Sequence, residues 1–209
     1  MNEPSGRYKL YGDFRSGNCY KAAQMLHLVG KEFDWAETDI LARATRTDEF
    51  LAMNPNGKVP VLQLPDGRVL SESNAMLLHL AEGTRWLPDD AYERALVYQW
   101  LFFEQYSHEP YIAVVRFIVS YAKSAGEQPE RIEELRKKGY AALDVMENRL
   151  ERRPFLAGDP FTIADIALYA YTHVAHEGGF EIEPFPAVRG WLDRVGEQPG
   201  MLAMREACA

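Results

Sequence analysis

The chain has 209 residues, of which 47% are hydrophobic and 26% charged, a composition typical of globular proteins and sufficient for one large domain or two small ones. Its formal net charge of −8 argues against nucleic acid as a partner, because binding to phosphates requires clustered cations. Residues 1–7 contain no apolar stretch typical of a signal peptide, and no apolar run reaches the length of a membrane span, about 18 residues, so we expect no membrane partner.

The N-terminal part of the chain alternates strand and helix patterns. Residues 7–11 predict a first strand. Residues 19–29 have the apolar spacing of an amphipathic helix, which Gly30 ends. Residues 33–37 predict a second strand, and a short helix is expected at residues 47–53.

The run from Asn54 to Leu80 carries the most specific pattern in the chain. It begins with Asn-Pro-Asn-Gly, a cluster of turn residues, and continues with a β-branched and aliphatic segment that favours a strand. Pro-Asp-Gly then predicts a tight turn. We therefore expect a turn at residues 54–57, strands at 59–64 and 68–70 joined by the turn 65–67, and a helix at 74–80.

Two features of this run point to peptide binding. Pro60 stands at the entrance of a strand, where a missing N–H is tolerated, and such a proline can follow a cis peptide bond. A cis bond after Val59 would turn the main-chain N–H and C=O of Val59 outward, where they can pair with an extended peptide. Ser73 stands at the start of a helix, where unpaired N–H groups and the helix dipole attract a carboxylate.

The second half of the chain shows helix patterns only. A linker is expected at residues 84–90. Asp90 is expected to cap a long helix over about residues 91–123, which Pro110 should kink or break. Another helix is expected at residues 129–152.

A capping box is predicted farther along. The Thr162 side chain can accept from the N–H of Asp165, while the Asp165 carboxylate can accept from the N–H of Thr162. Phe161 and Ile166 are placed to form the accompanying hydrophobic staple. We interpret this box as a folding element without chemistry.

Gly-Lys-Val-Pro at residues 57–60, followed by Glu-Ser-x-Ala at 72–75, resembles the glutathione transferase superfamily, and the resemblance covers nearly the whole chain. It implies an α/β thioredoxin-like N-terminal domain at residues 7–83. A linker at 84–90 and an all-α C-terminal helical domain at 91–209 would follow.

The resemblance also implies an activity. Such an enzyme would conjugate the thiolate of glutathione to electrophilic, mostly apolar small molecules, a detoxification reaction. Glutathione would be the co-substrate, with no metal or further cofactor. The protein would be a bacterial-type homodimer in the cytoplasm.

Conjugation requires a means of ionising the glutathione thiol, since only the thiolate attacks electrophiles. The unperturbed pKa of a thiol is about 8.5, and lowering it by about two units corresponds to roughly 2.7 kcal/mol. A hydroxyl hydrogen bond together with a helix N-terminus is about sufficient. A donor is therefore expected where the first strand meets the first helix.

Three residues at this junction compete for the role. Ser16 lies at a helix N-cap, and the spacing from Leu10 to Cys19, Leu-Tyr-x-Asp-x-x-Ser-x-x-Cys, resembles the serine-type classes, notably theta; the alternative is a plain cap. A thiol at Cys19, near a helix N-terminus, can be acidic, or it can be a small buried hydrophobe. Tyr11 matches the strand end used by tyrosine-type classes less well. Asn18 is a possible further donor to the sulfur.

The remaining glutathione contacts follow from the resemblance. Glu72 and Ser73 match the site of the γ-glutamyl end, although Glu72 can also be a solvated charge. Val59, which precedes Pro60, matches the main-chain partner of the cysteinyl part. Lys58 either pairs with the glycyl carboxylate or is a solvated lysine at a strand edge.

The second substrate would be bound mainly by aromatic residues. Aromatic residues at helical spacing can also be plain core, and a histidine among them can be a structural residue with a hydrogen-bond partner. The candidates for this role are Phe14, Tyr106, His108 and Tyr111.

Neither a metal site nor a disulfide is expected. His173 and His176 lie three residues apart, but no third ligand accompanies them. Cys19 and Cys208 lie near opposite ends of the chain and are expected to be free thiols in a reducing compartment.

Two other functions stay open. A glutathione-dependent disulfide or peroxide reductase would form a mixed disulfide on Cys19 or on glutathione itself. A non-catalytic binding module would keep the fold and either not bind glutathione or bind it without ionising it. Comparing Ser16→Ala with Cys19→Ala distinguishes the transferase from the reductase that uses Cys19.

Overall fold

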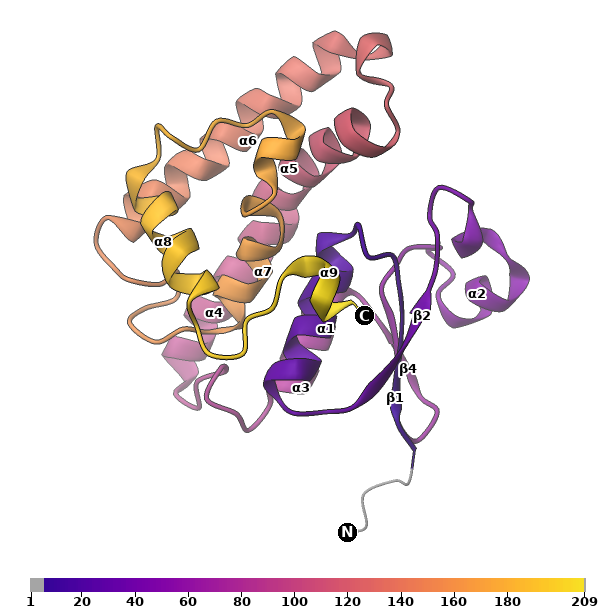
Figure 1. Ribbon diagram of the computed structural model, residues 1–209. Coiled ribbons are helices and arrows are strands. Elements are labelled where there is room, and N and C mark those ends of the chain that lie inside the picture. Colours follow the sequence, from indigo (N-terminus) through magenta and orange to yellow (C-terminus); the bar gives the residue numbers. More distant parts are fainter. Residues whose placement is uncertain (1–5, 209) are drawn as a thin grey trace. The chain divides into compact units, whose positions relative to one another are not determined.

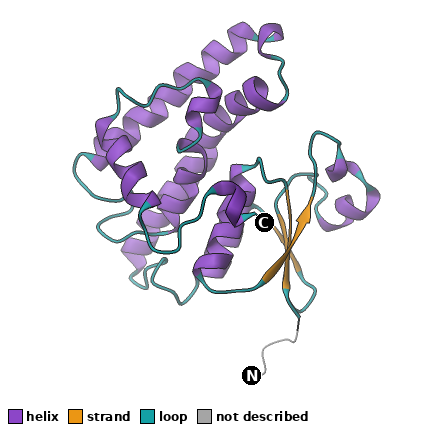
Figure 2. Cartoon of the chain, viewed as in Figure 1, coloured by secondary structure: helices purple, strands orange, loops and turns teal. Residues whose placement is uncertain are grey.

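The computed structural model describes residues 6–208 and divides into two compact units. The first unit contains the described residues up to Thr84 and those from Pro199 onward, and the second contains Arg85–Gln198. All strands lie in the first unit (Figures 1 and 2). The boundary near Thr84 falls where the sequence predicts a linker, whereas the residues after Pro199, which we expected in the helical domain, group with the first unit.

The first unit is built on a mixed four-stranded sheet with strand order β2-β1-β3-β4. β1 pairs in parallel with β2, while β3 pairs antiparallel with both β1 and β4. Inward-facing Leu10 and Leu62 stand opposite each other in neighbouring strands and are fully buried. The strands are β1 (Tyr8–Gly12), β2 (Phe33–Glu37), β3 (Val61–Gln63) and β4 (Val69–Ser71).

Helices cover both sides of this sheet. Figure 1 shows α1 (Gly17–Leu28) and α3 (Ser73–Ala81) side by side on one face, with α2 (Asp48–Met53) across the sheet from them. A short 3₁₀ turn, Ala44–Arg46, leads into α2. The unit therefore has the expected thioredoxin-like arrangement, and the N-termini of α1 and α3 belong to the same helical layer.

The C-terminal segment returns to α1 and ends with the short helix α9 (Met204–Ala207). The Tyr20 hydroxyl donates to the carbonyl of Leu202 at 3.0 Å. The Gln24 side chain donates to the carbonyl of Gly200 at 2.8 Å and accepts from the N–H of Leu202 at 2.9 Å. These bonds fasten the segment along α1 and explain why it belongs to the first unit.

Every regular element of the second unit that the structure describes is a helix. Asp90 caps its first helix, as predicted, because its carboxylate accepts from the N–H groups of Tyr92 and Glu93 at 2.9 and 3.0 Å. No helix among residues 6–208 is long and apolar enough to cross a membrane. The main helices of the unit are α4 (Ala91–Phe103), α5 (Glu109–Arg116), α6 (Pro129–Leu150), α7 (Ile163–Thr172) and α8 (Pro186–Gly196).

The helical path from α4 to α5 is interrupted where Pro110 predicts a break. A π-helical turn, Glu104–His108, joins the two helices, and Pro110 lies in the first turn of α5. Proline lacks an N–H and its ring clashes with the carbonyl four residues earlier, so the preceding turn widens. A second π-helical turn, Phe117–Tyr121, follows α5.

The predicted capping box is present at the start of α7. The buried carboxylate of Asp165 accepts from the N–H of Thr162 at 3.0 Å, and also from the N–H of Leu156 at 2.9 Å and the indole of Trp191 at 3.0 Å. Asp165 thus ties three segments of the second unit together, in keeping with a structural role.

Candidate active site in the first unit

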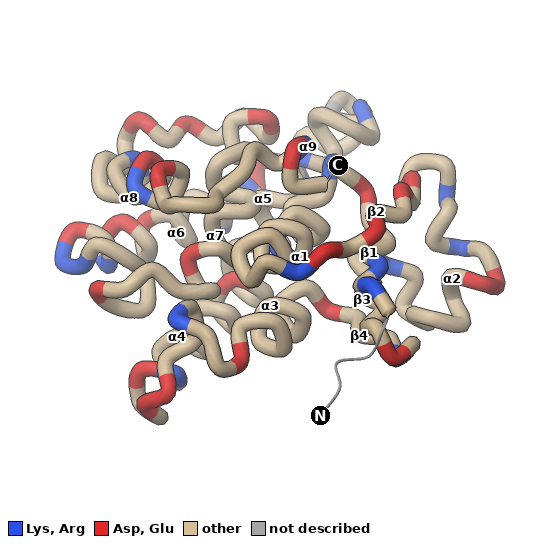
Figure 3. The backbone as a smooth tube through the Cα atoms, turned by 60° about the horizontal axis from the view of Figure 1, so that its bottom comes forward, with Lys and Arg blue, Asp and Glu red and all other residues tan. Residues whose placement is uncertain are grey.

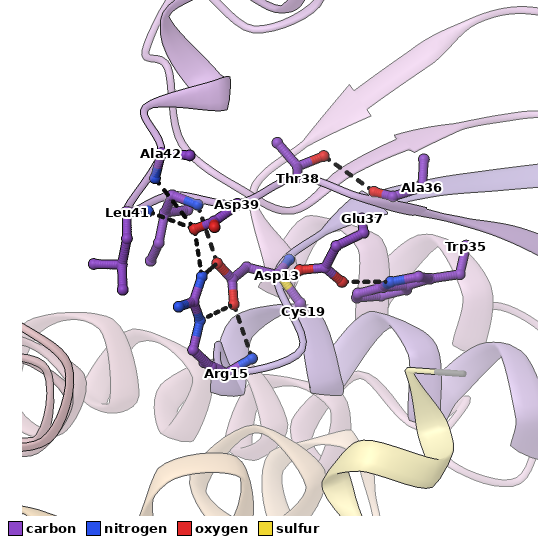
Figure 4. A network of polar contacts seen from close by, with 11 residues as sticks. Asp13, Arg15, Cys19, Trp35, Ala36, Glu37, Thr38, Asp39, Leu41 and Ala42 are labelled. Carbon is purple, nitrogen blue, oxygen red and sulfur yellow. Dashed lines mark hydrogen bonds and ion pairs between the residues drawn. The ribbon is translucent and has the colours of Figure 1, made fainter.

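The turn between β1 and α1 is held by a buried ion pair (Figure 4). The Asp13 carboxylate, with no exposed surface, accepts from Nε and Nη2 of Arg15 at 2.8 and 2.6 Å. It also accepts from the main-chain N–H of Arg15 and of Ile40 at 3.0 and 3.1 Å. Arg15 is shared with Asp39, whose carboxylate lies 2.5 Å from Nη2. The turn that carries Ser16 is therefore held by contacts within itself and by contacts with residues 39 and 40 after β2.

Burial by itself would raise the pKa of Asp13, but the hydrogen bonds from the Arg15 side chain and from the N–H groups of Ile40 and Arg15 lower it below its ordinary value. The same side chain keeps the pKa of Asp39 below its usual range. Both carboxylates are therefore ionised at neutral pH, and their negative charges compensate the positive charge of Arg15.

Ser16 is the N-cap residue of α1, as predicted. Its hydroxyl oxygen accepts from the N–H of Cys19 at 3.4 Å, and its main-chain N–H donates to the carbonyl of Asp13 at 2.9 Å. A hydroxyl that accepts a hydrogen bond still carries its own proton for donation. Capping and donation to a sulfur atom are therefore compatible roles for this half-buried residue.

The Cys19 thiol lies beneath the surface at the start of α1. Its side chain is fully buried, and its sulfur accepts from the N–H of Asp13 at 3.4 Å. Burial raises the pKa of the Cys19 thiol to about 12, although its neighbour Ser16 and the N–H of Asp13 act in the opposite direction. The structure thus favours the small buried residue over the reactive thiol. Tyr11 lies within β1 with the Lys9 ammonium 4.8 Å from its ring centroid, which fits strand packing.

A polar network joins the N-termini of α1 and α3. The Ser73 hydroxyl donates to Oδ1 of Asn18 at 3.1 Å. The ammonium of Lys21 lies 3.5 Å from Oγ of Ser73 and 3.4 Å from Oδ1 of Asn74. Lys21 has no exposed surface, so water screens its charge only weakly and its electrostatic interactions at this position are strong. Helix N-termini and a buried cation together make the start of α3 attractive to a carboxylate.

Glu72, which precedes α3, has an unusual main-chain conformation. Its φ is +70° and its ψ is 113°, although it is not a glycine. Such conformations cost about 1–3 kcal/mol and are concentrated at functional sites. The strain and the exposed position of its side chain are consistent with a binding role for Glu72.

The segment before β3 leaves the N–H and C=O of Val59 available for an extended peptide, as the sequence indicates. Gly57, with φ of +63°, closes the turn by donating to the carbonyl of Asn54 at 2.9 Å, and the Asn54 amide donates to the carbonyl of Lys58 at 2.8 Å. The peptide bond between Val59 and Pro60 is cis. Within residues 6–208, the N–H and C=O of Val59 make no hydrogen bond. Lys58 is exposed at this edge.

Phe14, a candidate for contact with the second substrate, lies in the same turn as Ser16. Its side chain keeps 37% of its surface exposed. The guanidinium carbons of Arg15 and Arg205 lie 5.5 and 5.3 Å from the ring centroid. The ring is therefore a partly exposed aromatic surface with two guanidinium groups close to it.

The other three candidates belong to the second unit. Tyr106 is 82% exposed, and the Lys138 ammonium lies 5.7 Å from the ring of Tyr111. His108 is fully buried, and its Nε2 lies 2.9 Å from the hydroxyl of Thr172. This contact favours the structural role that the sequence left open for His108, while Tyr106 and Tyr111 stay predictions.

Sequence reasoning missed Lys21, Arg15 and Arg205. Lys21 falls within the helix predicted at residues 19–29. A charged residue among apolar neighbours in that helix was the signal that could have identified it. Nothing in the sequence indicates that Arg205 lies near Phe14, because the two residues are far apart in the chain. The described residues contain no group of three or more His, Cys, Asp or Glu side chains that could hold a metal ion.

Comparisons with known proteins agree with these features. The chain matches the family descriptions "Glutathione S-transferase, N-terminal domain" over residues 15–82 and "Glutathione S-transferase, C-terminal domain" over residues 99–199. Glutathione S-transferase F13 of Arabidopsis thaliana is 33% identical over 210 residues, covering 93% of each chain.

Two further relatives are informative. The disulfide-bond oxidoreductase YfcG of Escherichia coli is 32% identical over 189 residues, covering 87% of each chain. The crystal structure of a glutathione S-transferase from Pseudomonas fluorescens is 55% identical, with a TM-score of 0.92, and covers 94% of this chain and 98% of its own. The chain therefore belongs to the glutathione transferase superfamily.

Proposed function

We propose that the protein is a serine-type glutathione transferase that conjugates the glutathione thiolate to electrophilic, mostly apolar small molecules. The observation that carries this proposal is the position of the Ser16 hydroxyl, which caps α1 and keeps a proton to donate to the sulfur. In the reaction, the thiolate attacks an electrophilic carbon, a carbon–sulfur bond forms, and the leaving group departs with the electron pair of its bond.

In this proposal the three parts of glutathione are bound by separate features of the first unit. The cysteinyl main chain pairs with the N–H and C=O of Val59. The γ-glutamyl end is bound by Glu72 and by Ser73 at the start of α3, where the Lys21 ammonium lies close. Lys58 pairs with the glycyl carboxylate. Asn18, whose side-chain oxygen accepts from Ser73, is a further candidate donor to the sulfur.

A glutathione-dependent disulfide reductase is the second candidate. A relative that is 32% identical is named a disulfide-bond oxidoreductase. The buried Cys19 argues against a mixed disulfide on the protein. If this chain reduces disulfides, the glutathione thiolate at Ser16 attacks one sulfur, a glutathionyl mixed disulfide forms, and the other sulfur leaves as a thiolate. A second glutathione then releases the remaining thiol and forms oxidised glutathione.

Substitutions at Ser16 separate donation from capping. Ser16→Ala removes both roles, and Ser16→Asp keeps an acceptor for the cap but has no proton to donate at neutral pH. A hydrogen bond to a charged group contributes about 1.5–3 kcal/mol, so kcat/KM should fall by about 10- to 100-fold in both variants. Only Ser16→Ala should lose helix stability, by about 1 kcal/mol. Ser16→Thr should keep both properties.

Cys19→Ala is the matched control, and each variant is assayed with glutathione and a panel of electrophiles, disulfides and peroxides. Turnover that survives Ser16→Ala but is lost in Cys19→Ala would contradict the proposal. Turnover of disulfides alone by the wild type would favour the reductase. Glutathione bound without any turnover would indicate a binding module.

The protein is further proposed to be a cytoplasmic homodimer, and its two buried free cysteines are consistent with a reducing compartment.

A further inference from the structure

The C-terminal segment places a cation beside the turn that carries Ser16. Its hydrogen bonds to Tyr20 and Gln24 fix the segment along α1. Arg205 then lies with its guanidinium carbon 5.3 Å from the ring centroid of Phe14. Such a cation–π contact occupies a face of the guanidinium and leaves its N–H edge for another partner.

Arg205 differs from its neighbour Arg15 in how its charge is balanced. Arg15 is bound by Asp13 and Asp39, so its charge is compensated. Arg205 is exposed, and no carboxylate in the part of the chain that the structure describes pairs with it. The adjacent Glu206 instead accepts from the N–H of Ala203 at 3.2 Å. Basic and acidic positions are interspersed along the first unit (Figure 3). The unbalanced charge of Arg205 is therefore not part of a larger basic patch among the described residues.

Phe14 and Ser16 belong to one tight turn. The N–H of Ser16 donates to the carbonyl of Asp13 at 2.9 Å, which closes a four-residue turn with Phe14 as its second residue. The ends of such a turn lie within about 7 Å of each other. Phe14, with the Arg205 guanidinium over its ring, therefore stands on the same short turn as the residue whose hydroxyl is proposed to bind the glutathione sulfur.

We propose that Arg205 is a specificity-determining residue that favours electrophiles bearing a carboxylate, with an aromatic part of the substrate resting on Phe14. This inference rests on the proposed transferase activity and names the class of its second substrate. For an aryl chloride, the thiolate attacks the ring carbon that carries chlorine, the aryl–sulfur bond forms, and chloride leaves. Arg205 takes no part in these bond changes and only binds the carboxylate.

The test compares a chlorodinitrobenzoate with its neutral carboxamide, assayed with glutathione on the full chain. Arg205→Gln removes the charge, Arg205→Lys keeps it, and Arg189→Gln makes the same change in net charge at another exposed arginine in the second unit. An exposed ion pair contributes about 0.2–1 kcal/mol, so kcat/KM for the benzoate should fall by about 1.5- to 5-fold in Arg205→Gln. The carboxamide should be unaffected, and the preference should weaken as salt is raised.

Several results would overturn the inference. Equal kcat/KM values for the benzoate in wild type and Arg205→Gln would do so, as would an equal loss for benzoate and carboxamide or an equal loss in Arg189→Gln. In each of these cases the transferase activity itself stands, since the carboxamide is still conjugated. If the wild type conjugates neither compound, the proposed function fails and the inference fails with it.

Discussion

Removing the carboxylate of Asp13 should destabilise the protein substantially. Asp13 has no exposed surface and accepts four hydrogen bonds, two of them from the guanidinium of Arg15. Breaking a buried ion pair by removing one partner costs about 3–5 kcal/mol. We expect the lower end for Asp13→Ala, about 3 kcal/mol, because Arg15 keeps Asp39 as a partner and its side chain is 17% exposed.

Denaturant unfolding followed by circular dichroism measures this loss directly. For a chain of this length, about 3 kcal/mol corresponds to a fall in Tm of roughly 6–12 °C, provided that unfolding is a single transition. Asp39→Ala is the matched control, since it removes the exposed partner of the same arginine and should have a markedly smaller effect. A free energy of unfolding for Asp13→Ala within about 0.5 kcal/mol of wild type would refute the reasoning.

The pH dependence of the same comparison is a further test. The pKa of Asp13 is lower in the folded chain than its ordinary value, about 3.9. Ionised Asp13 therefore contributes stability above about pH 4, and this contribution is lost as the pH falls through the folded-state pKa. The difference in stability between wild type and Asp13→Ala should shrink on acidification below about pH 4. A difference that is constant down to acid unfolding would contradict the assignment.

Two further predictions concern the proposed glutathione site. Lys21→Met should weaken glutathione binding by about tenfold or more, because it removes a buried charge close to Ser73. Lys21→Arg keeps the charge and should keep most of the affinity. Calorimetric titration with glutathione measures the affinity of both variants, and an unchanged affinity in Lys21→Met would contradict a role for the charge. Glu72→Gly should relieve the strained φ of +70° and raise stability by about 1 kcal/mol while reducing glutathione affinity. A variant that is both less stable and equally tight in binding would show that Glu72 is neither strained nor a ligand contact.

Many elements of both units could be predicted from local chemistry. The turn residues from Asn54 to Gly57 and the alternation of strand and helix fix the elements, and Ser16 is recognisable as a cap from its type and place. Pro110 indicated the break between α4 and α5. These features depend on neighbouring residues only, which is why sequence patterns identify them.

The parts that sequence reasoning missed depend on tertiary contacts. The sequence left Cys19 open between an acidic thiol and a small buried residue, and its complete burial, which raises the pKa of the thiol, favours the second. The polar link from Asn18 to Ser73 joins two helices separated by 55 residues. The return of the C-terminal segment to α1 depends on hydrogen bonds such as the one from Gln24 to Gly200, which no local pattern encodes. The sequence left His108 open between a substrate contact and a structural residue, and its partner Thr172, 64 residues away in the chain, could not be identified from local patterns.

The central claim is that the first unit binds glutathione and lowers the pKa of its thiol through the Ser16 hydroxyl. Titration of the thiolate ultraviolet absorbance of glutathione bound to the wild type and to Ser16→Ala tests it most directly. We expect the bound thiol to have a pKa about two units below the free value of about 8.5 in the wild type, and a pKa about one to two units higher than that in Ser16→Ala. Glutathione that binds with an unshifted thiol pKa, or with the same lowered pKa in both proteins, would contradict it.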